Sequence, residues 1–241
     1  MNEAPKCGYC AIMGETPHCH NCKIFNKVKS TPRAPQELPY KLKDLIAYIE
    51  NPDNSFDENL QVGDYFWISL TTGEKLKAVL LEKERDKSAD NTTLKTTFGV
   101  ESSTVRIVMD PKSRYDDYPS TQANQIYLPH LFKLFPKALR EAIKPALKMC
   151  SSAGERKHEA FPLWLFSEGE ITNNYYTTDT CERYEYFTKD ANRIAWFGSG
   201  KQSWLRSVYS GSYCYTNSNY TNGVTYANPA NAHGVSFGFC I

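Results

Sequence analysis

Four cysteines near the start of the chain are the residues whose type and spacing most clearly predict chemistry. They form two Cys-x-x-Cys knuckles separated by eight residues: Cys7, Cys10, Cys19 and Cys22. Four thiolates at such spacing are typical of a closed tetrahedral Zn²⁺ site, which has no open position for catalysis. We therefore expect a structural zinc ion as the cofactor of this segment.

Two alternatives to a site of four thiolates stay open. His18 and His20 flank Cys19, so three cysteines and one histidine could hold the ion. Two disulfides could form instead, although intracellular thiols stay reduced. Residues 1–29 lack the apolar side chains for a core of their own, so metal binding, worth about 10–16 kcal/mol in such peptides, must supply their folding energy.

Basic side chains surround the knuckles and raise the question of a partner: Lys6, Lys23, Lys27, Lys29 and Arg33. Basic patches on zinc ribbons often contact nucleic acid, which gives one alternative function. Beyond Phe25, however, no aromatic residues alternate with the basic ones to stack on bases. We favour a docking module that tethers, stabilises or oligomerises the protein, or joins it to a particle.

The C-terminal stretch has the most unusual composition. From Ser207 to Ile241 there is no Asp, Glu, Lys or Arg, and the stretch is crowded with Tyr, Asn, Ser and Gly. Tyrosine gives a large, rigid contact area, and Ser, Gly and Asn give adaptable hydrogen bonds, as in antibody paratopes. The same composition also suits the edge of a β-rich domain, with aromatic cross-strand pairs and turns such as Asn222-Gly223. Composition alone leaves both interpretations open.

Length and charge limit the class of protein. The 241 residues suit one large domain with a small appendage, and the net charge of +1 excludes a globally basic nucleic-acid binder or an acidic tail protein. No apolar run approaches the roughly 18–20 residues that span a bilayer, and the N-terminus has no signal-peptide core. We expect synthesis in the cytoplasm and no membrane insertion.

Periodicity predicts the elements that must position these residues. Three prolines over 30–40 indicate a linker, and a helix follows over 40–50. The remaining elements are a hairpin over 62–81, a polar loop over 82–95, strand structure over 98–109, helical structure over 128–149 divided at Pro136 and Pro145, a polar loop over 151–160, and a short strand over 163–166.

Five short blocks carry a resemblance to known families: Leu163–Glu168 (LWLFSE), Tyr184–Phe187 (YEYF), Arg193-Ile194 (RI), Ser203–Ser207 (SWLRS) and Gly234–Ile241 (GVSFGFCI). Their order resembles the C-type-lectin-like domain of bacterial and prophage proteins related to formylglycine-generating enzymes. It also resembles the variable proteins of diversity-generating retroelements. The resemblance covers roughly residues 60–241 and does not include the cysteine knuckles.

The resemblance implies an α+β fold. It would be a C-type-lectin-like domain with short helices and a twisted antiparallel sheet, preceded by a zinc-ribbon-like module. The domains would be 1–29 (zinc module), 30–60 (linker and helix) and 61–241 (ligand-binding domain). The implied function is a non-enzymatic receptor-recognition protein of a phage or prophage, diversified by a retroelement and associated with the virion. Its partner would be a protein or a glycan.

Retroelement mutagenesis acts at template adenines, so asparagine codons become Tyr, Ser, Asp, Gly, Cys, His or Arg codons. The family pattern then implies variable, ligand-facing positions at Tyr209, Ser212, Tyr213, Tyr215, Asn217, Asn219, Tyr220, Asn222, Tyr226, Asn228, Asn231 and His233. The matching scaffold positions, expected to be buried, are Trp204, Leu205, Val235, Phe237 and Phe239. Arg206 also matches a scaffold position, and we expect it to pair inward with Glu168 or Glu170.

Residues for catalysis are not grouped in the sequence. The related oxidases bind copper with a cysteine pair, but Cys181, Cys214 and Cys240 do not match its spacing, so an oxidase is the weaker alternative. Calcium needs several carboxylates, and none follows Arg206. If 167–171 is extended, Glu168 and Glu170 share a face, which we interpret as a salt-bridged structural pair. We therefore expect no enzymatic activity.

Overall fold

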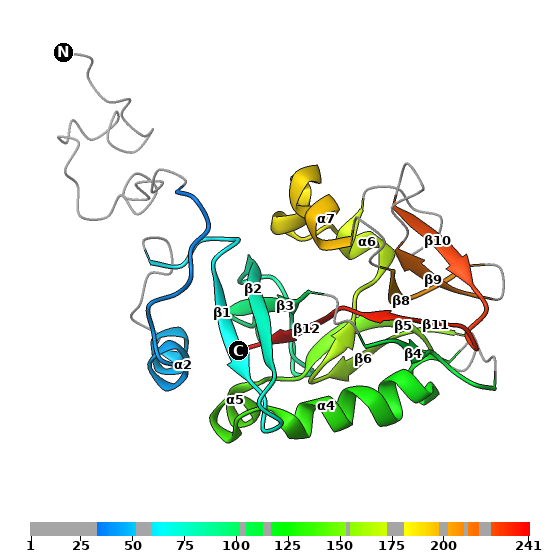
Figure 1. Cartoon of the computed structure of the whole chain (residues 1–241), viewed down its shortest axis with the longest axis horizontal. Coiled ribbons are helices and arrows are strands. Elements are labelled where there is room, and N and C mark those ends of the chain that lie inside the picture. Colours follow the sequence, from blue (N-terminus) through cyan, green and yellow to red (C-terminus); the bar gives the residue numbers. More distant parts are fainter. Residues whose placement is uncertain are drawn as a thin grey trace, which may run out of the picture.

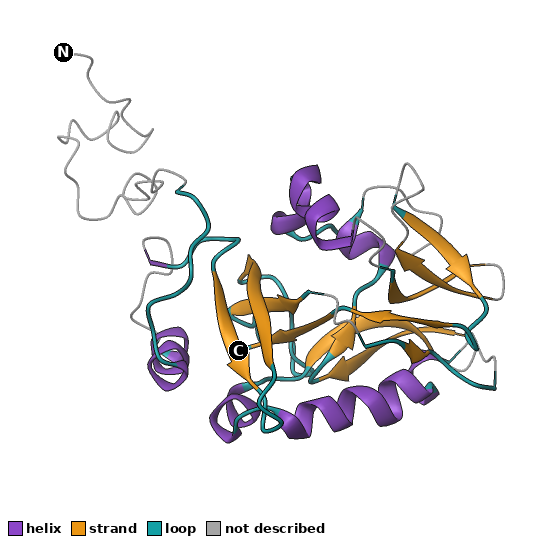
Figure 2. Ribbon diagram, viewed as in Figure 1, coloured by secondary structure: helices purple, strands orange, loops and turns teal. Residues whose placement is uncertain are grey.

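The computed structural model describes residues 33–51, 59–101, 105–112, 117–152, 155–172, 181–197, 202–209, 212–216 and 223–241, without the side chains of 214–216. These ranges form a mixed α+β structure of mainly antiparallel sheets and short helices (Figures 1 and 2). Of the helices in these ranges, none combines the length and the apolar character needed to cross a membrane.

The first sheet has five strands in the order β1-β2-β3-β12-β7. They are β1 (Tyr65–Ser69), β2 (Lys75–Lys83), β3 (Thr96–Val100), β12 (Phe237–Cys240) and β7 (Trp164–Leu165). The predicted hairpin is confirmed as β1 and β2, which pair in antiparallel register. Its turn contains Gly73 at φ +91°, a backbone conformation that glycine adopts without strain.

The second sheet also has five strands, in the order β10-β9-β8-β11-β4. They are β10 (Val224–Ala227), β9 (Ser212–Thr216), β8 (Ser203–Tyr209), β11 (Ala232–Val235) and β4 (Ile107–Val108). β8 and β11 are parallel, whereas the other neighbours are antiparallel. Only Ser236 separates β11 from β12, so the last ten residues join the two sheets, as the red segment in Figure 1 shows.

A separate hairpin pairs β5 (Ala146–Ser152) with β6 (Glu155–Phe161). The predicted helical structure up to Met149 and the predicted loop over 151–160 are therefore wrong. β5 alternates between buried and half-buried residues, but one buried position is Lys148, which hides the apolar alternation. β6 is exposed along most of its length and so carries the charged residues that indicated a loop.

The helices are short. They are α2 (Leu42–Glu50), α4 (Leu128–Leu134), α5 (Lys137–Ala142), α6 (Glu168–Ile171) and α7 (Asp190–Phe197), with 3-10 turns η1 (Tyr118–Ser120) and η3 (Glu185–Thr188) and the π-helical η2 (Ala123–Tyr127). The prediction of α2 is confirmed, as is the division at Pro136, where α4 ends before α5 begins. The sequence reading missed α7 and the turns.

Two apolar clusters fill the space around the sheets. The larger takes side chains from α2, α4 and α5, and the smaller takes them from α6, η3 and α7. In Figure 1, α4 and α5 lie along one side of the strands and α6 and α7 along the other. Trp204 contributes to the larger cluster and Leu205 to the smaller, so β8 is buried on both faces along its first half.

Candidate functional site

An exposed pair of tyrosines lies on the second sheet. Tyr209 ends β8 and Tyr226 lies in β10, and their ring centroids are 5.2 Å apart with an interplanar angle of 41°. The two residues are 36% and 54% exposed. β9 runs between these strands, and half-buried Ser212 stands opposite Tyr209 in the register. The two rings therefore meet over β9, where a small side chain leaves them room.

The other face of the same strands packs inward. Tyr213 stands opposite Val208, is fully buried and belongs to the larger apolar cluster. Burial raises the pKa of its phenol well above the usual value. This residue was expected to face a ligand, but the structure places it in the interior, because successive residues of a strand point to opposite faces.

A tight turn connects β10 to β11 and holds two of the expected asparagines. The backbone N–H of Asn231 donates to the carbonyl of Asn228 at 2.9 Å, and the N–H of Ala230 donates to the Asn228 side-chain oxygen at 2.9 Å. Asparagine followed by proline favours such a turn. Both asparagines are exposed, and the side-chain oxygen of Asn228 helps to fix the turn.

His233 lies under the surface between β4 and β8. It is 8% exposed, its ring stands edge-on to Trp204 at 4.6 Å, and Nδ1 lies 3.2 Å from Oε1 of Gln202. Burial, reinforced by the charge of Arg106, lowers the pKa of His233 to about 4. This expected position therefore also turns inward, and a neutral, packed imidazole is a poor ligand contact.

The structure describes no side chain for the other expected positions of the tail. Tyr215 lies in β9, but its side chain is not described, and Asn217, Asn219, Tyr220 and Asn222 lie outside the described residues. The next residue, Gly223, has φ +70°, as a turn glycine would. The exposed residues Tyr209, Tyr226, Asn228 and Asn231, together with half-buried Ser212, are called the tyrosine surface below.

The predicted burial of the scaffold positions is confirmed. None of the following is more than 2% exposed: Trp204, Leu205, Val235, Phe237 and Phe239. They come from β8 and from β11 and β12, and the last two strands join the two sheets. Tyr209 therefore lies on a strand whose first half is fixed in the core.

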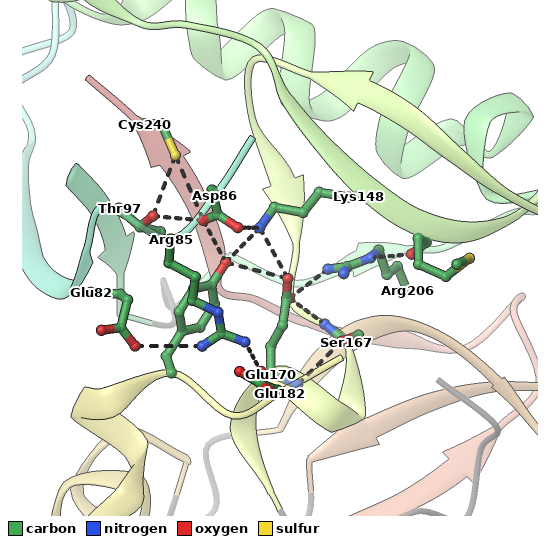
Figure 3. Close-up of polar contacts among 12 residues, drawn as sticks. Glu82, Arg85, Asp86, Thr97, Lys148, Ser167, Glu170, Glu182, Arg206 and Cys240 are labelled. Atoms are coloured by element: carbon green, nitrogen blue, oxygen red, sulfur yellow. Dashed lines mark hydrogen bonds and ion pairs between the residues drawn. The ribbon is translucent and has the colours of Figure 1, made fainter. Parts of the chain in front are cut away.

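Arg206 pairs inward, as expected. It is 1% exposed, and its Nη1 lies 2.6 Å from Oε2 of Glu170 (Figure 3). Nη1 and Nε also donate to the carbonyls of Leu165 and Met149 at 2.6 and 2.9 Å. One guanidinium therefore joins β8 to α6, β7 and β5.

The segment around Glu170 is not extended, because 168–171 is a helical turn, but the predicted structural ion pair is confirmed for Glu170. Ser167 caps the turn. The Ser167 hydroxyl accepts from the N–H of Glu170 at 3.2 Å, and Glu170 Oε2 accepts from the N–H of Ser167 at 2.9 Å. A reciprocal capping box of this kind satisfies two backbone donors. It also holds the Glu170 carboxylate where Arg206 can reach it.

A second buried ion pair adjoins the first. Lys148 Nζ lies 2.5 Å from Oδ1 of Asp86 and 3.2 Å from Oε1 of Glu170. It also donates to the Tyr184 hydroxyl at 2.6 Å and lies 4.2 Å from the centre of the Trp164 ring. Figure 3 shows the Lys148 amine pointing into the gap between the two carboxylates.

Pairing with opposite charges shifts the pKa values of this cluster more than burial does. Burial alone would raise the pKa of Glu170, but Arg206 and Lys148 hold it well below its usual range. Burial alone would lower the pKa of Lys148, but Glu170 and Asp86 raise it. The cluster thus contains two cations and two carboxylates, and burying them is tolerable because each charge is paired.

The described part of the chain contains no group of side chains arranged as a metal site and no disulfide. Cys7, Cys10, Cys19 and Cys22 lie outside it, and the described residues contain no group of three or more His, Cys, Asp or Glu placed to hold a metal. Cys181 and Cys240 are not in disulfides. Burial, then the charge of Asp86, raises the pKa of the Cys240 thiol well above its usual value, which suits a packed thiol.

Sequence reasoning missed three members of the buried cluster. Asp86 follows Arg85 in a polar segment, and Lys148 occupies a position that was assigned to a helix. Tyr184 belongs to a block that was used only for the resemblance. A polar residue within a run of apolar ones, as at Lys148, is the one signal that could have indicated a buried charge.

Comparison of the chain with protein-family models, with curated proteins and with solved structures finds no match. The tyrosine surface and the scaffold beneath it are therefore the features from which a function is inferred.

Proposed function

We propose that this chain is a non-enzymatic ligand-binding protein that recognises a protein or a glycan through its tyrosine surface. The observation that carries the proposal is the contact between Tyr209 and Tyr226, two exposed rings on a sheet whose opposite face is buried. Exposed aromatic side chains that can bury large areas are the usual anchors of recognition surfaces.

The tail residues of this surface are polar and uncharged. Ser212, Asn228 and Asn231 supply hydroxyl and amide groups, and the stretch from Ser207 to the end of the chain has no ionic side chain. Such a surface selects its ligand by shape, stacking and neutral hydrogen bonds, and not by charge. A glycan or an uncharged patch of protein fits this chemistry.

The scaffold limits the entropy lost on binding. Tyr209 lies three residues after Arg206, whose guanidinium is fixed by Glu170 and two carbonyls. A binding residue held on a strand with a fixed interior loses less conformational freedom when its ligand arrives. This support from the core is the reason to assign the binding role to the sheet.

The finer assignments belong to the same proposal. The fold would be C-type-lectin-like, the cysteine knuckles would bind structural zinc, and a retroelement would diversify the tail. A near-copy of the codons for 200–240 beside a reverse-transcriptase gene, differing only at adenines, would support diversification. Its absence from the genome would contradict that part and leave the binding proposal standing.

The binding proposal is tested with an oligosaccharide array and a library of displayed peptides as probes for the full chain. We expect selective binding to members of one of the two. The double variant Tyr209→Ala/Tyr226→Ala should lose about 2 kcal/mol or more of binding free energy, roughly thirtyfold in Kd. Its melting temperature should stay close to that of the wild type, because both side chains are exposed.

The proposal fails if the wild type binds neither probe set. It also fails if the double variant binds the same members with wild-type affinity. If the double variant unfolds, the two tyrosines have a structural role, and the alternative of an aromatic sheet edge is correct.

A further inference from the structure

The buried cluster contains a lysine, an aspartate and a glutamate in contact. Lys148 Nζ is 2.5 Å from Oδ1 of Asp86, so the amine contacts an oxygen that is bonded to the carboxyl carbon Cγ. Glu170 Oε1 is 3.2 Å from the same amine. All three residues are buried, and the first two come from β5 and from the loop after β2.

The other oxygen of Asp86 is held by hydroxyl donors. Thr97 Oγ1 donates to Oδ2 at 2.6 Å, and the Tyr184 hydroxyl donates to it at 3.0 Å (Figure 3). Donors fixed on one oxygen of a carbonyl group stabilise the negative charge that develops there during nucleophilic attack. The Trp164 ring, 4.2 Å from the amine, covers it with an apolar surface.

We propose that Lys148 and Asp86 join in an intramolecular isopeptide bond, formed by the folded protein itself with Glu170 as the proton carrier. The product is an amide between Nζ and Cγ, and one water is released. No oxidant, reductant or other reactant is needed, because an ammonium and a carboxylate contain all the atoms of an amide and a water.

The condensation takes two proton transfers, one nucleophilic attack and the loss of one water. A proton moves from the Lys148 ammonium to Oδ1, and the neutral amine attacks Cγ while Oδ2 takes the negative charge. Glu170 accepts a second proton from the nitrogen and passes it to Oδ1. The C–Oδ1 bond breaks, water leaves, and Oδ2 becomes the amide oxygen, still bound by Thr97 and Tyr184.

Proximity accelerates this condensation inside the fold. Well-oriented intramolecular groups react at effective concentrations of about 10⁵–10⁸ M, which exceeds the concentration of liquid water. Burial alone would lower the pKa of Lys148, yet Glu170 and Asp86 raise it, so the neutral amine is a minor species. A reaction that occurs once per molecule tolerates a minor reactive species.

The charges remain balanced after the reaction. Lys148 and Asp86 lose one positive and one negative charge together, and Arg206 stays paired with Glu170 at 2.6 Å. The bond would close a loop between residues 62 positions apart in sequence and fasten the β5–β6 hairpin to the first sheet. A crosslink of this kind reduces the freedom of the unfolded chain, as a disulfide does.

The test is the intact mass of the full wild-type chain, purified, reduced and denatured. We expect a mass one water below that of the sequence. Protease digestion and fragmentation should yield a branched peptide that joins Lys148 to Asp86. A mass equal to that of the sequence overturns the proposal, as does a water loss that maps to any other pair of residues.

Three variants sharpen the test. Lys148→Met should have the full mass of its sequence, whereas Lys157→Met, which changes a lysine on the exposed strand β6, should remain one water lighter. Asp86→Asn should release ammonia instead of water and end at the same mass as the wild type. The wild-type result decides the proposal even if a variant fails to fold.

Discussion

The guanidinium of Arg206 and the carboxylate of Glu170 meet at 2.6 Å, with both side chains almost completely buried. Arg206 is the last charged residue of the chain, and the uncharged tail begins directly after it. The pair therefore fixes the strand at the point where its residues change from the core to the tyrosine surface. The anchor and the binding surface are parts of one strand.

Breaking this anchor should be costly. Arg206→Met leaves the Glu170 carboxylate buried without its guanidinium partner, and we expect a loss of about 3–5 kcal/mol in the free energy of unfolding. Urea denaturation measures this loss. Lys137→Met is the control, because Lys137 and Glu141 form an exposed pair on α5, and breaking it should change stability by less than about 0.5 kcal/mol. Equal losses in the two variants would contradict the structural role of Arg206.

The inward pairing of Arg206 was predictable from the sequence because a lone cation before an uncharged tail needs a partner. The hairpin of β1 and β2 was also predictable, since its turn glycine separates two apolar runs. The face on which each tail residue lies was not predictable. Alternation places neighbours on opposite faces, but only the packed structure decides which face is the interior, and so Tyr213 was assigned to the wrong side.

The charged cluster marks another limit of sequence reasoning. Lys148 and Asp86 are 62 positions apart and contact each other only because β5 packs beside the loop after β2. A lysine and an aspartate are most often exposed, so local patterns assigned Asp86 to a polar loop and Lys148 to a helix, and neither to a buried ion pair. Their pairing depends on tertiary structure that no local pattern encodes.

Tyr213 should tolerate the loss of its hydroxyl. The hydroxyl is buried, and in the described part of the chain it has no hydrogen-bond partner. A buried polar group without a partner costs free energy, so Tyr213→Phe should leave stability unchanged or raise it by about 1 kcal/mol. Tyr213→Ala should lose about 3–5 kcal/mol, because it also removes the packed ring. A large loss in the phenylalanine variant would show that the hydroxyl has a partner.

His233 should make stability depend on pH. Its pKa is about 4 in the folded protein, against 6.5 as the ordinary value. The unfolded chain therefore takes up a proton below pH 6.5 while the folded protein does not. The contribution is complete above pH 6.5, and stability falls by about 1–2 kcal/mol as the pH drops toward 5.

Carboxylates also change their protonation over part of this pH range. The effect of His233 is therefore measured as the difference in stability change between the wild type and a variant. Denaturation of the wild type and of His233→Gln is compared at pH 7 and pH 5. The wild type should lose more stability than the variant between these two values. An identical change in the two proteins would show that His233 titrates normally.

The most direct measurement for the central claim compares two exposed aromatic side chains on different sheets. Tyr226 lies in the tyrosine surface, and Trp67 is 45% exposed in β1, where it stands edge-on to Tyr65 at 6.2 Å. Using the strongest ligand from the oligosaccharide array or peptide library, titration calorimetry should show that Tyr226→Ala raises Kd roughly ten- to thirtyfold. Trp67→Ala should leave Kd within about twofold of the wild type. Loss of binding in the Trp67 variant, with unchanged binding in the Tyr226 variant, would contradict the account.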